Sequence, residues 1–141
     1  MNGKGIYKKG SISYIGNFNN FKKEGKGDLF TNKFHYRGEF NNDEMNGKGR
    51  IEIYDQGIYE GNFTNNEITG KGVFMYKDGS IYRGDMKKGE INGFGKFIKH
   101  DGTTFEGNFV NGLDGGNVKI TFPDGSVKNG RISKGEIFPE K

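Results

Sequence analysis

Apolar and polar residues alternate along most of the chain with a period of two. Tyr82, Gly84 and Met86, for example, fall on one face of an extended strand, while Arg83 and Asp85 fall on the other. Alternation over short segments is typical of a half-buried β-strand. The pattern predicts strands over residues 14–18, 36–40, 59–63, 82–86 and 105–109, each followed by a second strand.

The alternating segments form an internal repeat. The motif aromatic-x-Gly-x-apolar starts at residues 14, 36, 59, 82 and 105, which gives spacings of 22, 23, 23 and 23 residues. A Gly-x-Gly-x-apolar motif starts 11 residues after each of these positions, at 25, 47, 70 and 93, with an altered copy at 116. Units that recur at a fixed spacing are typical of repeat proteins, in which each unit packs only against its neighbours.

Short segments that contain Gly or Asn join the predicted strands. Gly adopts positive φ without strain and Asn tolerates it, so both residues favour the tight turns of β-hairpins. The turn candidates are the Asp-Gly steps at 78–79, 101–102 and 124–125 and the Asn pairs at 19–20, 41–42 and 65–66. Each unit therefore predicts a hairpin, and the series predicts an all-β fold built on one elongated antiparallel sheet.

The repeat covers residues 1–132, which we interpret as one domain. It comprises a partial unit at 1–13, units that start at 14, 36, 59, 82 and 105, and a decayed half unit at 128–132, while 133–141 form a C-terminal tail or cap. Terminal units of a stack are expected to be atypical because they cap it. Val118 replaces the second glycine of its motif and Lys128 replaces an aromatic residue, so we expect the best-formed surface over 36–109.

Each unit places glycine inside its strands, where it normally weakens a sheet. Glycine is tolerated in a strand where another group must approach the backbone closely. We infer that aromatic rings lie flat over the bare backbone and take the place of a second layer of the core. The structural glycines that share a face with the aromatic residues are Gly16, Gly38, Gly61, Gly84 and Gly107.

The aromatic stripe on this face is the candidate partner-binding site. A single-layer sheet cannot bury such a face alone, and large exposed apolar patches usually mark binding surfaces. The competing interpretation is that the rings only form the core, which we also assign to Leu29, Ile51, Phe74, Phe97 and Ile120 of the second strands. The aromatic stripe comprises Tyr14, Phe18, Tyr36, Phe40, Tyr59, Phe63, Tyr82, Met86, Phe105 and Phe109.

Composition narrows the function classes. The chain has no cysteine, which excludes disulfides, thiolate zinc sites and cysteine nucleophiles. It has no run of 18 apolar residues and no signal-peptide pattern at its start, so we expect an intracellular, cytoplasmic protein. The net charge of +4 is spread along the chain, so nucleic acid is not expected as a partner.

The residues that could carry catalysis do not form a site. Gly-x-Gly recurs in every unit without a following helix, so it reads as structural and not as a phosphate loop. His35 and His100 lie in different units, where we expect solvated strand ends. Acidic residues on the outer face alternate with arginines, and cross-strand ion pairing explains them better than paired catalytic carboxylates; they are Glu39, Glu60, Asp85, Glu106, Arg37, Arg83 and Arg131. We expect no enzyme, metal site or cofactor.

The repeated motif, with Asp-Gly before the next aromatic residue, resembles the membrane occupation and recognition nexus (MORN) repeat over about residues 1–132. The resemblance implies an open single-layer antiparallel sheet, curved or twisted with a groove, and a scaffolding role at membranes or the cytoskeleton. The length and the residues from Gly93 to Gly125 are similar to retinophilin-like members, which bind a class III myosin tail. Homodimers are also implied.

Two functions follow as expectations. In the first, the chain is a scaffold that binds a helical or extended segment of a protein partner, such as a myosin tail or another cytoskeletal protein, along the aromatic-glycine groove. In the second, it is a peripheral membrane module that binds anionic phospholipid through loop lysines, for which Lys22-Lys23 and Lys87-Lys88 are the candidates. A homodimer formed through the aromatic face or an unpaired edge strand also stays open.

Overall fold

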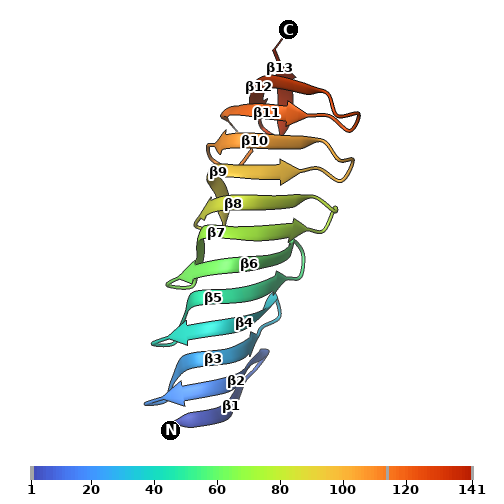
Figure 1. Cartoon of the computed structure of the whole chain (residues 1–141). Coiled ribbons are helices and arrows are strands. Elements are labelled where there is room, and N and C mark those ends of the chain that lie inside the picture. Colours follow the sequence, from blue (N-terminus) through green and yellow to red (C-terminus); the bar gives the residue numbers. More distant parts are fainter. Residues whose placement is uncertain (1, 114, 141) are drawn as a thin grey trace.

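The computed structural model describes residues 2–113 and 115–140, and these residues form a single antiparallel sheet of 13 strands and no helix. Each strand pairs only with its neighbours in the sequence, so the hairpins stack into a tall, twisted ladder with the chain ends at opposite ends (Figure 1). The strands are β1 (Gly3–Lys9), β2 (Ile12–Asn19), β3 (Lys22–Phe30), β4 (Phe34–Asn41), β5 (Glu44–Ile53), β6 (Gly57–Thr64), β7 (Glu67–Tyr76), β8 (Ile81–Lys87), β9 (Glu90–Ile98), β10 (Thr104–Phe109), β11 (Asn117–Thr121), β12 (Val127–Ser133) and β13 (Glu136–Pro139). The predicted fold class is confirmed.

Two kinds of turn occur at the predicted Asn and Asp-Gly connections. The β4–β5 turn has two residues, Asn42 and Asp43, both at positive φ of 53° and 72°. This is the geometry of a type I′ turn, whose twist matches that of the flanking strands. In the β7–β8 connection, the Asp78 carboxylate instead accepts a 2.9 Å hydrogen bond from the Ser80 backbone N–H. The turns therefore lie where the Asn pairs and Asp-Gly steps predict them.

Each strand from β1 to β9 has a glycine that pairs with a glycine of the next strand. These glycines form a continuous row across the sheet. Gly38 pairs with Gly27 on one side and with Gly49 on the other, and the same relationship recurs along the stack. We call this set the glycine row; it comprises Gly5, Gly16, Gly27, Gly38, Gly49, Gly61, Gly72, Gly84, Gly95 and Gly107. The row leaves a band of sheet without side chains.

The β2–β3, β4–β5, β6–β7 and β8–β9 hairpins each contain a bulge beside the glycine row. Asn41 pairs with Glu44 and Gly38 pairs with Gly49, so two residues of β4 face four residues of β5. The extra residues are accommodated at Gly47, whose φ is +98°, and the Glu39 carboxylate accepts a 2.7 Å hydrogen bond from the Lys48 N–H. A bulge bends its strand and increases the local twist. The first glycine of Gly-x-Gly thus supplies positive φ, while the second belongs to the glycine row.

The aromatic rings pack against one another on one face of the sheet. The Tyr36 ring stands edge-on to Phe40 of its own unit at 5.1 Å and to Phe63 of the next unit at 4.9 Å, which is a favourable geometry for aromatic pairs. The Tyr36 hydroxyl donates a 2.7 Å hydrogen bond to the Glu39 carbonyl of the same strand. This contact draws the ring across Gly49, where an added Cβ would lie within 3.0 Å of it. The predicted placement of rings over glycine is confirmed.

The fifth unit departs from this arrangement. Val118 of β11 takes the place of a glycine and is buried, so the space that the ring of an earlier unit occupies is filled here by an isopropyl group. Phe105 instead stacks on Phe97 with the rings 6.1 Å apart and 8° from parallel. After it, β12 and β13 continue the sheet, and β13 lies within the predicted tail or cap. Met1 and Lys141, the outer limits of the predicted segments, lie outside the described residues.

Candidate functional site

The ten residues of the aromatic stripe lie in the core. None of these side chains is more than 9% exposed, and the tyrosines Tyr14, Tyr36, Tyr59 and Tyr82 are fully buried. The expectation that a single-layer sheet leaves this face open is wrong, because the rings cover one another and pack over the glycines of the neighbouring strand. Contact between the aromatic stripe and a partner stays a prediction. Because the side chains are buried, the stripe offers a partner almost no exposed surface.

The residues that the sequence assigned to the core of the second strands, and His35, also have defined places in the structure. Ile51, Phe74, Phe97 and Ile120 are buried as predicted, and Leu29 packs half-buried against them. His35 is not a solvated strand end, because its Nε2 lies 2.9 Å from the Asp28 carboxylate and its ring stacks on Phe30. His35 is thus held in a structural contact.

Two of the predicted outer-face charges, Arg37 and Glu60, form cross-strand ion pairs. Arg37 Nε lies 2.8 Å from Asp28 Oδ1, and Arg50 Nε lies 3.0 Å from Glu60 Oε1. Glu39 and Asp85 accept hydrogen bonds from backbone N–H groups of the bulges. Within 2–113 and 115–140, Arg83, Arg131 and Glu106 are in no ion pair at 4.0 Å or less. Asp28, Glu39, Glu60 and Asp85 therefore make contacts within the sheet.

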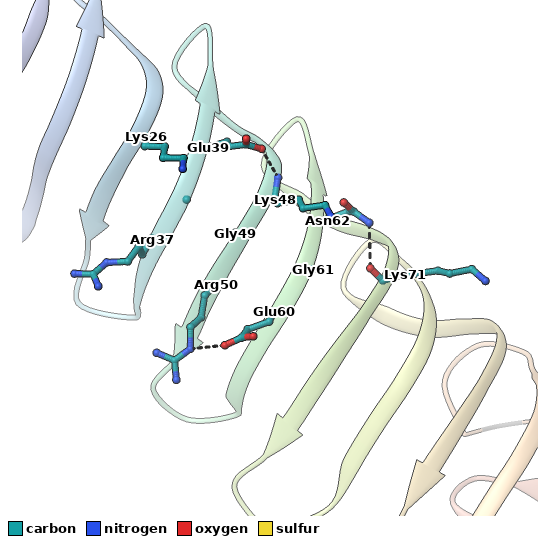
Figure 2. A pocket seen from close by; sticks show the side chains of 11 residues that line it. Lys26, Arg37, Glu39, Lys48, Gly49, Arg50, Glu60, Gly61, Asn62 and Lys71 are labelled. Carbon is teal, nitrogen blue, oxygen red and sulfur yellow. Dashed lines mark hydrogen bonds and ion pairs between the residues drawn. The ribbon is translucent and has the colours of Figure 1, made fainter.

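The face opposite the aromatic stripe carries a shallow groove along the glycine row. Its volume is about 690 Å³, and Gly38, Gly49 and Gly61 form its base. Side chains that precede and follow these glycines stand on its two sides, because neighbours of a residue in a strand point to the opposite face. Figure 2 shows two lines of side chains. One line consists of Lys26, Glu39, Lys48, Asn62 and Lys71, and the other consists of Arg37, Arg50 and Glu60.

A second hollow of about 500 Å³ continues the groove toward the N-terminus. It shares Lys26, Arg37 and Gly38 with the first and extends to Lys4 of β1. We call the two together the polar groove. Six cations and three carboxylates line it, for a net charge of +3: Lys4, Lys26, Arg37, Lys48, Arg50 and Lys71 against Asp28, Glu39 and Glu60.

The lysines give the polar groove its available positive charge. Lys4, Lys26, Lys48 and Lys71 are exposed, and none is in an ion pair at 4.0 Å or less within the described part of the chain. Arg37 is partly neutralised by Asp28. Although partial burial raises it, hydrogen bonds from Arg37 and His35 hold the pKa of Asp28 below its ordinary value, so the carboxylate stays charged.

These lysines were missed as site residues in the sequence, where they occur as the middle residue of Gly-x-Gly. The signal was present, since Lys recurs at this position in Gly3-Lys4-Gly5, Gly25-Lys26-Gly27, Gly47-Lys48-Gly49 and Gly70-Lys71-Gly72. A residue type that recurs at one position of a repeat forms a row on the stacked surface.

The lysines predicted to meet lipid are only partly free. Lys22 Nζ donates a 2.9 Å hydrogen bond to Asn42, and Lys23 Nζ lies 3.7 Å from the Asp43 carboxylate. Lys87 and Lys88 are exposed at the β8–β9 turn. Phe21, at the tip of the β2–β3 turn, is 80% exposed and has a φ of 64°, which is unusual for a bulky side chain.

Metal and membrane-spanning sites were also sought. No three His, Cys, Asp or Glu side chains among residues 2–113 and 115–140 lie close enough together to hold a metal ion. No helix in that part of the chain is long and apolar enough to cross a membrane.

The stacked hairpins, the glycine row and the ring that crosses it in four successive units define a tandem β-hairpin repeat protein. The family model for the MORN repeat matches residues 36–57, 59–81, 82–104 and 105–127, so the chain belongs to the MORN-repeat family. The unit that starts at Tyr14 lies outside the matched ranges, yet its ring crosses Gly27 in the same way. No curated protein matches the chain. MORN repeats form non-enzymatic scaffolds and are generally protein- or membrane-binding modules.

Proposed function

We propose that this chain is a non-catalytic scaffold that binds an acidic segment of a protein partner along the polar groove. The observation that carries the proposal is the line of exposed lysines, Lys4, Lys26, Lys48 and Lys71, beside the glycine row. The proposed docking surface is therefore the face opposite the aromatic stripe. A myosin tail or another cytoskeletal protein is the kind of partner that the family resemblance implies, and we propose that an acidic segment of it docks here.

The two lines of side chains support this assignment because they leave the backbone between them accessible to a ligand on this face. The net charge of +3 around the groove complements an acidic ligand. An exposed ion pair contributes only about 0.2–1 kcal/mol, so one or two contacts would bind weakly. A segment that crosses several units can add many such contacts, which favours a long polymer segment over a small molecule.

The experiment measures binding of a fluorescent Glu-rich peptide to the full chain by anisotropy. Lys48→Glu should weaken binding about fivefold to tenfold, and added salt should weaken it further, because the contacts are exposed charges. The matched control is Lys87→Glu, which makes the same charge change at an exposed position of β8 outside the groove. Equal binding by the two variants would place the peptide elsewhere and reject the proposal.

A second candidate is a peripheral membrane module, and Phe21 favours it. Its exposed ring stands at a hairpin tip next to Lys22 and Lys23, and an aromatic ring beside cations suits the interface of an anionic bilayer. Co-sedimentation with phosphatidylserine vesicles tests this candidate. Phe21→Asn should abolish binding, whereas an absence of binding by the unaltered chain would reject the membrane function.

A further inference from the structure

Resting on the proposed function, we infer that the polar groove selects one conformation and one spacing in its ligand. The ligand is a polyproline II-like segment with an acidic residue at every third position and an apolar residue one period beyond the acid at one end. Four lysines of the polar groove and Phe94, which lies beyond the groove at the same position of the fourth unit, specify this pattern.

The spacing comes from the strand order. Lys4, Lys26, Lys48 and Lys71 lie on β1, β3, β5 and β7, so consecutive lysines are separated by two strand steps. Neighbouring strands lie about 4.7–4.9 Å apart, which places the lysines at intervals of about 9.6 Å. A ligand that satisfies them must therefore present acids about 9.6 Å apart on a single face.

Polyproline II geometry meets this requirement. It has three residues per turn and rises about 3.1 Å per residue, so every third side chain lies on the same face at intervals of about 9.3 Å. In a β-strand, side chains three residues apart point to opposite faces. In an α-helix, residues seven apart share a face at intervals of about 10.5 Å, so the mismatch grows with each unit.

The base and width of the groove favour the same conformation. The glycines of the row lie between paired strands on both sides, so they offer a peptide few free N–H or C=O groups. A polyproline II segment needs no hydrogen bonds from these groups, because its backbone stays hydrated. The two lines of side chains start only about 6.7 Å apart, two residues along one strand. An α-helix is about 10–12 Å wide and would rest above the glycines rather than on them.

Phe94 takes the next position after the four lysines and makes that position apolar. It lies between Gly93 and Gly95 on β9, two strands beyond Lys71, and its side chain is 55% exposed. Its backbone N–H donates a 3.2 Å hydrogen bond to Asp85, as the Lys48 N–H does to Glu39, so the bulge presents Phe94 in the same way as a lysine. An apolar ligand residue that covers the ring would bury surface on both partners.

The test uses synthetic peptides and the full chain. The main probe has four Glu-Pro-Pro triplets and one Leu-Pro-Pro triplet, prepared with the leucine triplet at either end because the groove residues do not fix chain direction. Its isomer has the same composition with the glutamates clustered. A third probe is a helical peptide with glutamate at every seventh position. Isothermal titration calorimetry at low ionic strength should show the better triplet probe binding about tenfold tighter than its isomer.

The outcomes separate this inference from the proposed function. If the isomer or the helical peptide binds as tightly as the triplet probe, the spacing inference is wrong while an acidic ligand in the groove still stands. If no acidic probe binds, the proposed function is wrong as well.

Phe94→Lys tests the apolar position separately. The variant should prefer a probe with five Glu-Pro-Pro triplets, whereas the unaltered chain should prefer the leucine probe. An unchanged preference for leucine in the variant would overturn the role of Phe94.

Discussion

The side chain of Tyr59 crosses the backbone of Gly72, which lies on the neighbouring strand, so closely that a Cβ on that glycine would lie within 3.0 Å of the ring. The same relationship joins Tyr14 to Gly27, Tyr36 to Gly49 and Tyr82 to Gly95. It explains how one sheet layer buries its aromatic residues: the ring uses the space where a side chain would stand, and its hydroxyl turns back to its own strand.

Replacing Gly72 by alanine should therefore destabilise the fold. The added methyl group would displace the Tyr59 ring from a packed position, and overpacking of this kind costs about 1–3 kcal/mol. Urea denaturation followed by circular dichroism measures the change. Gly102→Ala is the control, because this turn glycine has a φ of +95° but open space around it. A loss at Gly72 no larger than the strain of about 1 kcal/mol expected at Gly102 would contradict the packing argument.

Ionisation of the core tyrosines should make the fold unstable at high pH. Burial raises the pKa of Tyr76 to about 12, and burial together with the charge of Asp85 also raises the pKa of Tyr82. The unfolded chain loses these protons at about pH 10, whereas the folded chain retains them. Stability should thus be constant below about pH 10 and fall as the pH rises through the folded values.

Tyrosinate absorbance and circular dichroism, followed together in a pH titration, check this expectation. The signal from the buried tyrosines should appear together with unfolding. Full ionisation of these groups in a chain that keeps its strand signal would contradict it. Tyr82→Phe, which removes one ionising group, should reduce the loss of stability above pH 10.

Phe21→Asn should stabilise the chain. Phe21 has a φ of 64° at the second turn position, where the β4–β5 and β6–β7 turns have Asp43 and Asn66. Asparagine tolerates this conformation better than a bulky residue, so relief of strain should raise the free energy of unfolding by about 0.5–1 kcal/mol. Thermal unfolding monitors the effect, and Phe21→Ala shows whether loss of the exposed ring alone accounts for it. A lower melting temperature for Phe21→Asn would show that Phe21 makes stabilising contacts.

The sequence predicted the strands and turns because the period of two and the Asp-Gly and Asn steps are local signals. It also predicted the ring over glycine, since Tyr82 and Gly84 share a face. It failed on exposure, because alternation tells which face a residue occupies and not whether neighbouring rings cover one another there. The register shift between Gly38 and Phe40 is likewise visible only when strand pairing is known. The recurrence of lysine in Gly-x-Gly is visible in the sequence. That these lysines line a groove is visible only once the strands are stacked.

Phe105 and Val118 offer the sharpest test of the packing in this repeat, in which a tyrosine ring crosses a glycine of the neighbouring strand. In four units a tyrosine crosses a glycine, while in the fifth both positions differ: the ring lacks a hydroxyl and the opposing residue has a side chain. Phe105→Tyr alone should destabilise the chain, because Val118 occupies the space that a crossing ring needs. Val118→Gly alone should also destabilise it, because a buried side chain is lost.

Combining Phe105→Tyr with Val118→Gly should restore part of the loss, because together they recreate the arrangement of Tyr82 and Gly95. Urea denaturation of the two single variants and the double variant gives the interaction energy, expected at about 1–2 kcal/mol in the favourable direction. The matched cycle with Phe105→Tyr and Ile132→Val should give additive effects, because Ile132 lies on β12, which pairs with β11 and β13 and not with the strand of Phe105. Additive losses in the first cycle would mean that the two departures in the fifth unit are independent.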